Sequence, residues 1–490
     1  MFMRKLSVLL IFLAIFICAA SASATTYYVD YSSGSDGNNG TSKTTPWKNA
    51  PGMAGCSGSC ASASPGAGDS IILKGGVTWP NSAFQWNWNW SGSSGNPVYI
   101  GVDQTWFTGG SWARPIMNAQ SATISGNNNF IQFGTGQSYV VIDNLEFTGM
   151  FWSGSQGYGH TVIINIQDGT HITIENSYFH NWTHGGSGTT DDLNAIQGST
   201  NPPYNVGSII THCIFTGLPN GGDSGSATYA VPEADHNIVH DLTNGFLVNN
   251  NISVHDNTIY NIRASFDPSV HENAIESTAG GTNYIYNNVI HDTIAITIFV
   301  GGGTGSSSET DYIFNNVIYN SPPIPVQIDT QPVGSGSAYI YNNTLDAGSS
   351  GGTAIRVVDR GQGPMSVLDI RNNQYLNGSG NPACYGSNSS GGCASANSVT
   401  DSSNLTMSSS AASSQGFTAS GSNPYAPQSG SAGTVKAGAN LTSRGITALD
   451  SDILNAARPA SGAWDIGAYF FGGAAATRPA PPTGINAVAH

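Results

Sequence analysis

The sequence predicts an all-β fold, a right-handed parallel β-helix of about eight to eleven rungs with an N-terminal cap and a C-terminal closing segment. Three observations predict it: a strand pattern that recurs along the chain, an asparagine column within that pattern, and a composition rich in turn-forming residues with only 9% charged residues. In a solenoid each rung packs only on its neighbours, so a chain of 490 residues does not require several domains.

The recurring pattern consists of an apolar residue, two mostly polar residues, a small or amide residue, any residue, and another apolar residue. The fourth positions of its eight copies are Leu145, Ser177, Cys213, Asn257, Asn288, Asn316, Asn343 and Asn373. Successive copies are 27 to 44 residues apart. A coil of three short strands and three turns needs about that length of chain.

The fourth position predicts an internal ladder. Alternate side chains of a strand point into the coil, so residues of successive rungs stack into columns. Asparagine tolerates left-handed turns, and its amide can hydrogen-bond the asparagine of the next rung. Cys213 shares this column, which makes it a small core residue. The other mature cysteines, Cys56 with Cys60 and Cys384 with Cys393, are expected to form two short-range disulfides.

The N-terminus has the features of a secretory signal. Arg4 and Lys5 precede an apolar stretch, and Ala22-Ser-Ala24 provides small residues for cleavage before Thr25. No later segment is long and apolar enough to span a bilayer. Removing two of the 14 basic residues leaves 12 against 29 acidic ones, a formal charge of −17, which disfavours nucleic-acid binding. We expect a secreted or periplasmic monomer.

The chain ends carry further motifs. Thr26-Tyr-Tyr-Val-Asp30, Gly34-Ser-Asp-Gly-Asn-Asn-Gly40 and Gly68-Asp-Ser-Ile-Ile-Leu-Lys-Gly75, with Arg458-Pro459 and Asp465-Ile-Gly-Ala-Tyr469 near the other end, resemble the opening and closing segments of the pectate-lyase-like superfamily. The resemblance implies the same β-helix fold and an extracellular polysaccharide as partner, but its motifs are architectural.

These features divide the chain into five parts. We expect a signal peptide at 1–24, a cap and first rung at 25–95, a β-helix body at 96–395, a Ser/Gly-rich excursion with the closing segment at 396–475, and a Pro-rich tail at 476–490.

A second strand before most of the later repeats predicts an outward stripe. Aligning these strands places the following residues in it: Gln197, Val248, Glu276, Thr297, Gln327 and Arg356. The same alignment stacks Asp192, His271 and Asp292 on successive rungs, with Glu272 beside them. We expect Gln197, Gln327 and Arg356 to contact substrate.

The segment from Asp267 to Glu276 has the densest group of titratable residues in the body. Glycosidic hydrolysis needs a carboxylic acid and a carboxylate at roughly 5 to 9.5 Å separation. Glu272 or Glu276 with Asp292 is the predicted pair, and His271 can tune a pKa by its charge. The alternative is that these residues are solvated or cap turns.

A third stripe lies three positions after the ladder residue. Tyr260 and Tyr319 in it are expected to stack on sugar rings, and Arg263 is a further candidate for substrate contact. The alternating Trp86, Trp88 and Trp90 predict a strand whose aromatic face packs under a cap or loop.

A lyase needs a different set of residues, a cation for a uronate carboxylate and a base. No lysine occurs between Lys74 and Lys436, which disfavours a lysine-based lyase but leaves one based on arginine, histidine or tyrosine. Calcium bridging the substrate to Glu272, Glu276 or Asp267 is an alternative, because hard cations take oxygen ligands. Asp191-Asp192 resembles the paired-aspartate strand of polygalacturonase-type hydrolases, but the other motifs of that family are missing.

The sequence therefore favours a secreted carbohydrate-active protein that cleaves an extracellular polysaccharide by carboxylate-based hydrolysis. A polysaccharide lyase, with calcium as a possible cofactor, and a non-catalytic polysaccharide-binding or adhesion module remain open.

Overall fold

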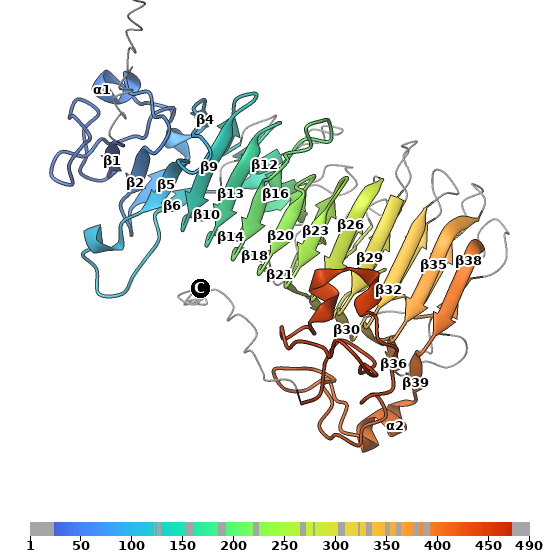
Figure 1. Ribbon diagram of the computed structural model, residues 1–490. Helices are drawn as coiled ribbons and strands as arrows, with labels where there is room; N and C mark the ends of the chain where they lie inside the picture. Colours follow the sequence, from blue (N-terminus) through green and yellow to red (C-terminus); the bar gives the residue numbers. More distant parts are fainter. Residues whose placement is uncertain are drawn as a thin grey trace, which may run out of the picture.

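The computed structural model describes residues 24–121, 123–124, 129–152, 161–184, 193–218, 225–264, 271–277, 280–301, 309–321, 324–329, 336–347, 353–358, 364–376, 382–385 and 393–472. Over these residues the chain winds into a parallel β-helix, whose rungs follow one another along Figure 1 from the blue N-terminal end to β38. Three long sheets form its walls, which confirms the predicted all-β solenoid. The whole of the predicted tail and all of the predicted signal peptide except Ala24 lie outside the described residues.

Sheet A contains 13 parallel strands. They are β1 (Thr26–Val29), β2 (Ser70–Leu73), β5 (Val98–Val102), β9 (Ser138–Asp143), β13 (Thr170–Glu175), β17 (Ile209–Thr211), β20 (Glu233–Asp235), β23 (Ser253–His255), β26 (Gly281–Tyr286), β29 (Glu309–Phe314), β32 (Ser337–Tyr341), β35 (Met365–Arg371) and β38 (Ala396–Ser402).

Sheet B contains 12 strands. They are β3 (Thr78–Pro80), β6 (Ile116–Asn118), β10 (Glu146–Thr148), β14 (Tyr178–His180), β18 (Ile214–Thr216), β21 (Ile238–His240), β24 (Thr258–Tyr260), β27 (Val289–His291), β30 (Val317–Tyr319), β33 (Thr344–Asp346), β36 (Gln374–Leu376) and β39 (Leu405–Met407).

Sheet C contains 11 strands, so 11 rungs have a strand in all three sheets, at the upper end of the predicted range. They are β4 (Trp86–Trp88), β8 (Ile131–Phe133), β12 (Thr161–Asn165), β16 (Leu193–Gln197), β19 (Ser226–Tyr229), β22 (Asn244–Val248), β25 (Ile275–Ser277), β28 (Ile298–Val300), β31 (Val326–Asp329), β34 (Ile355–Val358) and β37 (Ala383–Cys384).

The remaining elements are short. They are a small sheet of β7 (Thr123–Ile124), β11 (Phe151–Trp152) and β15 (Thr183–His184), the helices α1 (Gly58–Ala61) and α2 (Ser409–Ser414), and the 3-10 turns η1 (Asn81–Ala83), η2 (Gln104–Trp106), η3 (Thr442–Arg444) and η4 (Thr447–Asp450). Within the described residues, no helix has the length and hydrophobicity to cross a membrane.

The predicted asparagine ladder forms the turn between sheets A and B. Each ladder side chain donates from Nδ2 to Oδ1 of the next, at 3.0 to 3.1 Å. Each Nδ2 also donates to a backbone carbonyl, as Asn316 does to Ile285 at 2.9 Å. The residue before each ladder position has a positive φ, such as 55° at Asn315. The ladder therefore satisfies the buried polar groups of a tight turn on the rungs from Asn237 to Asn404.

The ladder is longer than the repeat predicted. Asn237 fills the 44-residue step between Cys213 and Asn257, and Asn404 extends the ladder beyond Asn373. The sequence pattern missed the rung of Asn237 because its first apolar position is Ala234, which is nevertheless fully buried.

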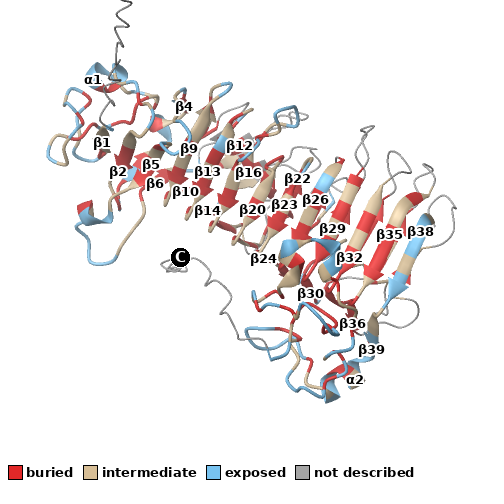
Figure 2. Cartoon of the chain, viewed as in Figure 1, coloured by how far each residue is buried: buried red, intermediate tan, exposed pale blue. Residues whose placement is uncertain are grey.

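The core consists of inward columns, visible as buried bands on the strands in Figure 2. Phe147, Phe179 and Phe215 stack with ring centroids 4.9 and 4.8 Å apart. Trp86 and Trp88 are fully buried on β4, as the aromatic alternation predicted. Cys213 is buried, and burial raises the pKa of its thiol to about 12. Both predicted disulfides, Cys56–Cys60 and Cys384–Cys393, are formed.

Two buried carboxyls interrupt the apolar columns at the start of β29. Asn283 donates from Nδ2 to Glu309 Oε1 at 3.0 Å and to Asp311 Oδ1 at 2.8 Å. Burial raises the pKa of both carboxyls, and the neighbouring Asp311 charge raises the pKa of Glu309 further. Burial therefore favours the protonated form of both carboxyls.

The sheets continue beyond the predicted body at both ends. Strands β1 to β4 belong to sheets A, B and C within the predicted cap, and β38 and β39 add strands beyond residue 395. From α2 onward the chain turns back and packs outside the coil, as the red segment of Figure 1 near β29 and β30 shows. Its backbone carbonyls at Ser451, Asp465 and Ala439 accept hydrogen bonds from the turn residues Asn315, Asn342 and Asn372, respectively. We call residues 408–472 the C-terminal strap.

Candidate functional site: the outer face of sheet C

Sheet C carries an outward column of side chains that we call the outer stripe. The pairing register aligns Asn87, Gln132, Asn165, Gln197, Tyr229, Leu247, Glu276, Phe299, Gln327 and Arg356 on successive strands. Neighbouring members are about 4.8 Å apart along the axis. The stripe is thus a straight line of side chains along one wall of the solenoid.

Four predicted stripe members are confirmed in position, namely Gln197, Glu276, Gln327 and Arg356. The other two predictions were wrong. Leu247, not Val248, pairs with Glu276, and Phe299, not Thr297, lies between Glu276 and Gln327. A shift of one residue turns a strand side chain to the opposite face of a sheet, so Val248 points into the core. Tyr229 belongs to the rung that the repeat missed.

Glu276 is the first carboxylate on this stripe and it contacts His271. The Glu276 Oε1 to His271 Nδ1 distance is 3.5 Å; the Glu276 side chain is 11% exposed and that of His271 63%. The hydrogen bond that Glu276 accepts from His271, together with the charges of Glu276, Asp329 and Glu272, raises the pKa of His271 although burial opposes the shift. Phe299 packs edge-on against the imidazole, with centroids 5.6 Å apart.

A second carboxylate, which sequence reasoning missed, lies two rungs further along, because β28 separates its strand from β25. Asp329 lies two residues after Gln327 on β31, so both side chains face outward, and Gln327 Nε2 donates to Asp329 Oδ1 at 2.9 Å. Gln327 Oε1 is buried and accepts no hydrogen bond from the described residues. Because Asp329 raises the pKa of His271, Asp329 and Glu276 act on the same imidazole. The alternation in Val-Gln-Ile-Asp329 was the available signal.

Arg356 is the cation of this part of the stripe. It lies beside Gln327 on β34. It forms no ion pair with the residues that the structure describes, whereas Arg371 is paired with Asp369. A cation without a carboxylate partner on an outward face can bind an anionic group of a ligand.

The predicted stack of His271 on Asp292 was wrong. The register of β25 and β28 sets Ile275 opposite Ile298, and its continuation sets His271 opposite Ile294. Asp292 directly follows β27, a strand of sheet B, and its Oδ2 lies 2.6 Å from His291 Nδ1. Glu272 lies next to His271 and is partly exposed. Asp267, Asp191 and Asp192 lie outside the described residues.

Three further predicted contacts lie on sheet B or beyond it, away from the outer stripe. Tyr260 is confirmed in an outward stripe, but His240 and His291 cover its two ring faces at centroid distances of 4.7 and 5.1 Å. Tyr319 is 9% exposed and packs against Tyr425 of the strap. Neither ring has a face free to stack on a sugar. Arg263 pairs with Asp241.

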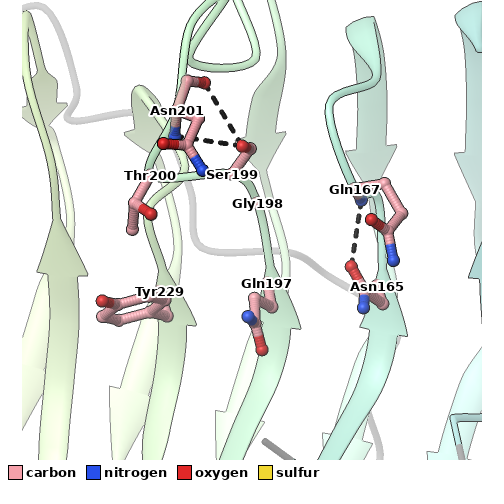
Figure 3. Close-up of a pocket in the computed structure, with 8 residues that line it drawn as sticks. All are labelled: Asn165, Gln167, Gln197, Gly198, Ser199, Thr200, Asn201 and Tyr229. Carbon is pink, nitrogen blue, oxygen red and sulfur yellow. Dashed lines mark hydrogen bonds between the residues drawn. The ribbon is translucent and has the colours of Figure 1, made fainter. Parts of the chain in front are cut away.

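The N-terminal half of the outer stripe is uncharged from Asn87 to Leu247. A pocket of about 250 Å³ opens there over β12, β16 and β19 (Figure 3). Amides of Asn165, Gln167 and Gln197, hydroxyls of Ser199 and Thr200, and the ring of Tyr229 line it. The stripe therefore changes from neutral polar to charged along one straight face.

The described residues contain no group of three or more His, Cys, Asp or Glu side chains placed to hold a metal ion. A calcium ion bridging Glu272 and Glu276 to a substrate would need oxygen ligands from the substrate or from other parts of the chain.

Comparison with known proteins gives likenesses of structure alone. No family model and no curated protein matches the chain. Among solved structures, a GH136 lacto-N-biosidase from Eubacterium ramulus is 12% identical with a TM-score of 0.38, covering 70% of this chain and 65% of that one. Pectate lyase Pel9A is 17% identical with a TM-score of 0.40, covering 91% and 97%. An alginate lyase from Paenibacillus sp. str. FPU-7 is 13% identical with a TM-score of 0.35, covering 61% and 91%.

This chain thus spans just under two thirds of the length of the lacto-N-biosidase. Because these TM-scores are low, the assignment of the fold depends on the strand pairing of this chain, and the candidate site is defined by the residues of this chain. Together these define a parallel β-helix with one long polar face that is charged at a single stretch.

Proposed function

We propose that this chain is a secreted enzyme that binds an extracellular polysaccharide along the outer stripe and cleaves its glycosidic bonds at Glu276. The observation that carries the proposal is the contact between Glu276 and His271 on a straight outward face. An extended glycan can follow such a face, and a carboxylate beside a protonatable imidazole can move a proton at one point along it.

The reaction that these residues support best is hydrolysis. It requires one carboxylic acid to protonate the leaving oxygen and one carboxylate to attack or to activate water. In our proposal Glu276 is the carboxylate, and His271, which contacts it, supplies a compensating positive charge when protonated. Asp329, which acts on the same imidazole, is the acid. This pair replaces the predicted pair of Glu276 and Asp292.

Elimination is the second candidate, and Arg356 is the observation that favours it. Its guanidinium is available to neutralise a uronate carboxylate, and Glu276 is a candidate base. However, Arg356 lies three strand spacings from Glu276, about 14 Å. At that separation Arg356 is better placed to bind a different uronate residue of the polysaccharide than to neutralise the uronate that loses its proton at Glu276. Hydrolysis therefore remains the primary proposal.

Product analysis tests this function. The mature chain is incubated with neutral and acidic polysaccharides, with calcium or with a chelator, and products are followed by reducing ends and ultraviolet absorbance. New reducing ends without an absorbance rise indicate hydrolysis, whereas a rise indicates the conjugated product of elimination. Loss of activity with the chelator indicates the calcium-assisted alternative. Binding without cleavage across the panel contradicts an enzyme and supports the adhesion module.

Two variants assign the site. Glu276→Gln should abolish cleavage and keep binding, because it removes the ionisable group and preserves the side-chain volume. Asp292→Asn is the matched control, since Asp292 lies beyond sheet B next to His291, and it should retain activity. Full activity of Glu276→Gln would exclude this carboxylate from the mechanism.

A further inference from the structure

The pocket on the neutral half of the outer stripe has a floor that the sheet holds in place. Asn165, Gln197 and Tyr229 occupy equivalent positions on neighbouring strands, and Figure 3 shows their side chains in a row. Regular strand pairing fixes their spacing at about 4.8 Å. Their side chains point outward, so they do not contribute to the core of the solenoid.

One wall of the pocket is a turn fixed by a buried asparagine. Asn205 is fully buried, donates to the carbonyls of Gln167 and Gly169 at 2.8 and 2.7 Å, and accepts from the Ser199 backbone N–H. A Cβ at Gly198 would lie 2.5 Å from Ala230 O and from Asn205 Oδ1, so only glycine fits there. These contacts preorganise the pocket, which reduces the entropy lost when a ligand binds.

The lining is polar without charge. None of its residues is ionised at neutral pH, and the amides and hydroxyls provide both donors and acceptors. Gln197 Oε1 is buried and accepts no hydrogen bond from the part of the chain that the structure describes, so these residues do not use this end of the amide. Rotation of the amide group by a half-turn would present that unused acceptor to a ligand. The ring of Tyr229 adds an apolar surface of the kind on which a sugar ring packs.

We propose that this pocket binds an uncharged sugar residue of the polysaccharide, about 10 to 14 Å from the cleavage point. Tyr229 and Gln197 lie two and three strand spacings from Glu276 on the same straight stripe. The substrate is therefore a polysaccharide that contains neutral sugars, and not a polymer of uronate alone. This inference rests on the proposed function, because it requires one glycan chain to occupy both the neutral and the charged half of the outer stripe.

Calorimetric titration tests the inference without turnover. The probes are linear hexasaccharides of glucose, mannose, galactose and xylose, with hexagalacturonate as the charged comparison, and the protein carries Glu276→Gln. At least one neutral probe should bind. Adding Gln197→Ala or Tyr229→Ala should weaken that binding roughly tenfold, the effect of losing one good contact.

The control is Thr258→Ala, which trims an outward side chain on sheet B and should leave binding unchanged. Failure of every neutral probe to bind would overturn the inference. It would also be overturned if adding Gln197→Ala or Tyr229→Ala left the affinity of the Glu276→Gln protein unchanged. The result is independent of catalysis: if the Glu276→Gln variant still cleaves polysaccharide, the proposed function fails, while neutral-sugar binding lost in Gln197→Ala still establishes the pocket.

Discussion

Replacing Asn316 by alanine removes one step of the asparagine ladder and tests its contribution to stability. Asn316 Oδ1 accepts both the backbone N–H and the Nδ2 of Asn288, each at 3.0 to 3.1 Å. Without it, two buried donors lose their acceptor. A buried donor left unsatisfied costs about 1 to 3 kcal/mol. Asn343 Oδ1 keeps its bond from the Asn316 backbone, so we expect a loss of about 2 to 6 kcal/mol in the free energy of unfolding.

The assay is urea unfolding followed by far-ultraviolet circular dichroism. Thr310→Ala is the control, because Thr310 is an outward, partly exposed residue of sheet A, and it should change the free energy of unfolding by less than about 1 kcal/mol. Asn316→Ser should fall between the two, since Ser177 occupies the same column in an earlier rung. A loss for Asn316→Ala no larger than that of the control would refute the reasoning that the ladder amides stabilise the turn.

Three further predictions concern buried or paired groups. The folded-state pKa of Glu309 is raised, so the unfolded chain releases that proton at a lower pH than the folded chain does. Between the unfolded-state and folded-state pKa values, the free energy of unfolding should therefore fall as pH rises, by up to about 1.4 kcal/mol per pH unit. Urea unfolding of Glu309→Gln at several pH values should show a much weaker dependence on pH. Glu276 raises the pKa of His271, so the ion pair between them is complete below the pKa of His271 and is lost as pH rises through it. An NMR titration should show that the pKa of His271 is lower in Glu276→Gln than in the unmodified protein. An unchanged pKa would contradict the contact. The thiol of Cys213, with a pKa of about 12 and full burial, should not react with iodoacetamide in the folded protein but should react in urea, as mass spectrometry would show.

The sequence predicted the architecture because the coil repeats the same turn. Asparagines at a regular spacing need no tertiary information to be recognised, and Asn288 and Asn343 lie where the repeat placed them. The rung of Asn237 was missed because the preceding β-strand has Ala234 where other rungs have a branched residue. Residues of neighbouring rungs fill the space beside a small residue in the same inward column. Ala234 therefore fits there, although the sequence of its own rung does not show the apolar pattern.

The site was predicted only in part because it depends on the direction of each side chain. Gln197, Glu276, Gln327 and Arg356 were placed correctly, since their strands share a simple alternation. Asp292 was misplaced because counting back from an alanine assumes equal turns, whereas the chain leaves β27 through a corner before it reaches β28. The role of Asp329 depends on its proximity to His271 across rungs, which one strand does not reveal.

The C-terminal strap changes how the solenoid should respond to a local disturbance. In an ordinary solenoid each repeat is coupled only to the next, so the end repeats can open one by one. Here hydrogen bonds join the strap to Asn315, Asn342 and Asn372 on three successive rungs. Opening any one of these rungs breaks its hydrogen bond to the strap and so disturbs the segment that all three rungs contact. The C-terminal third of the coil should therefore exchange its amide hydrogens as one cooperative unit, while the N-terminal rungs exchange independently.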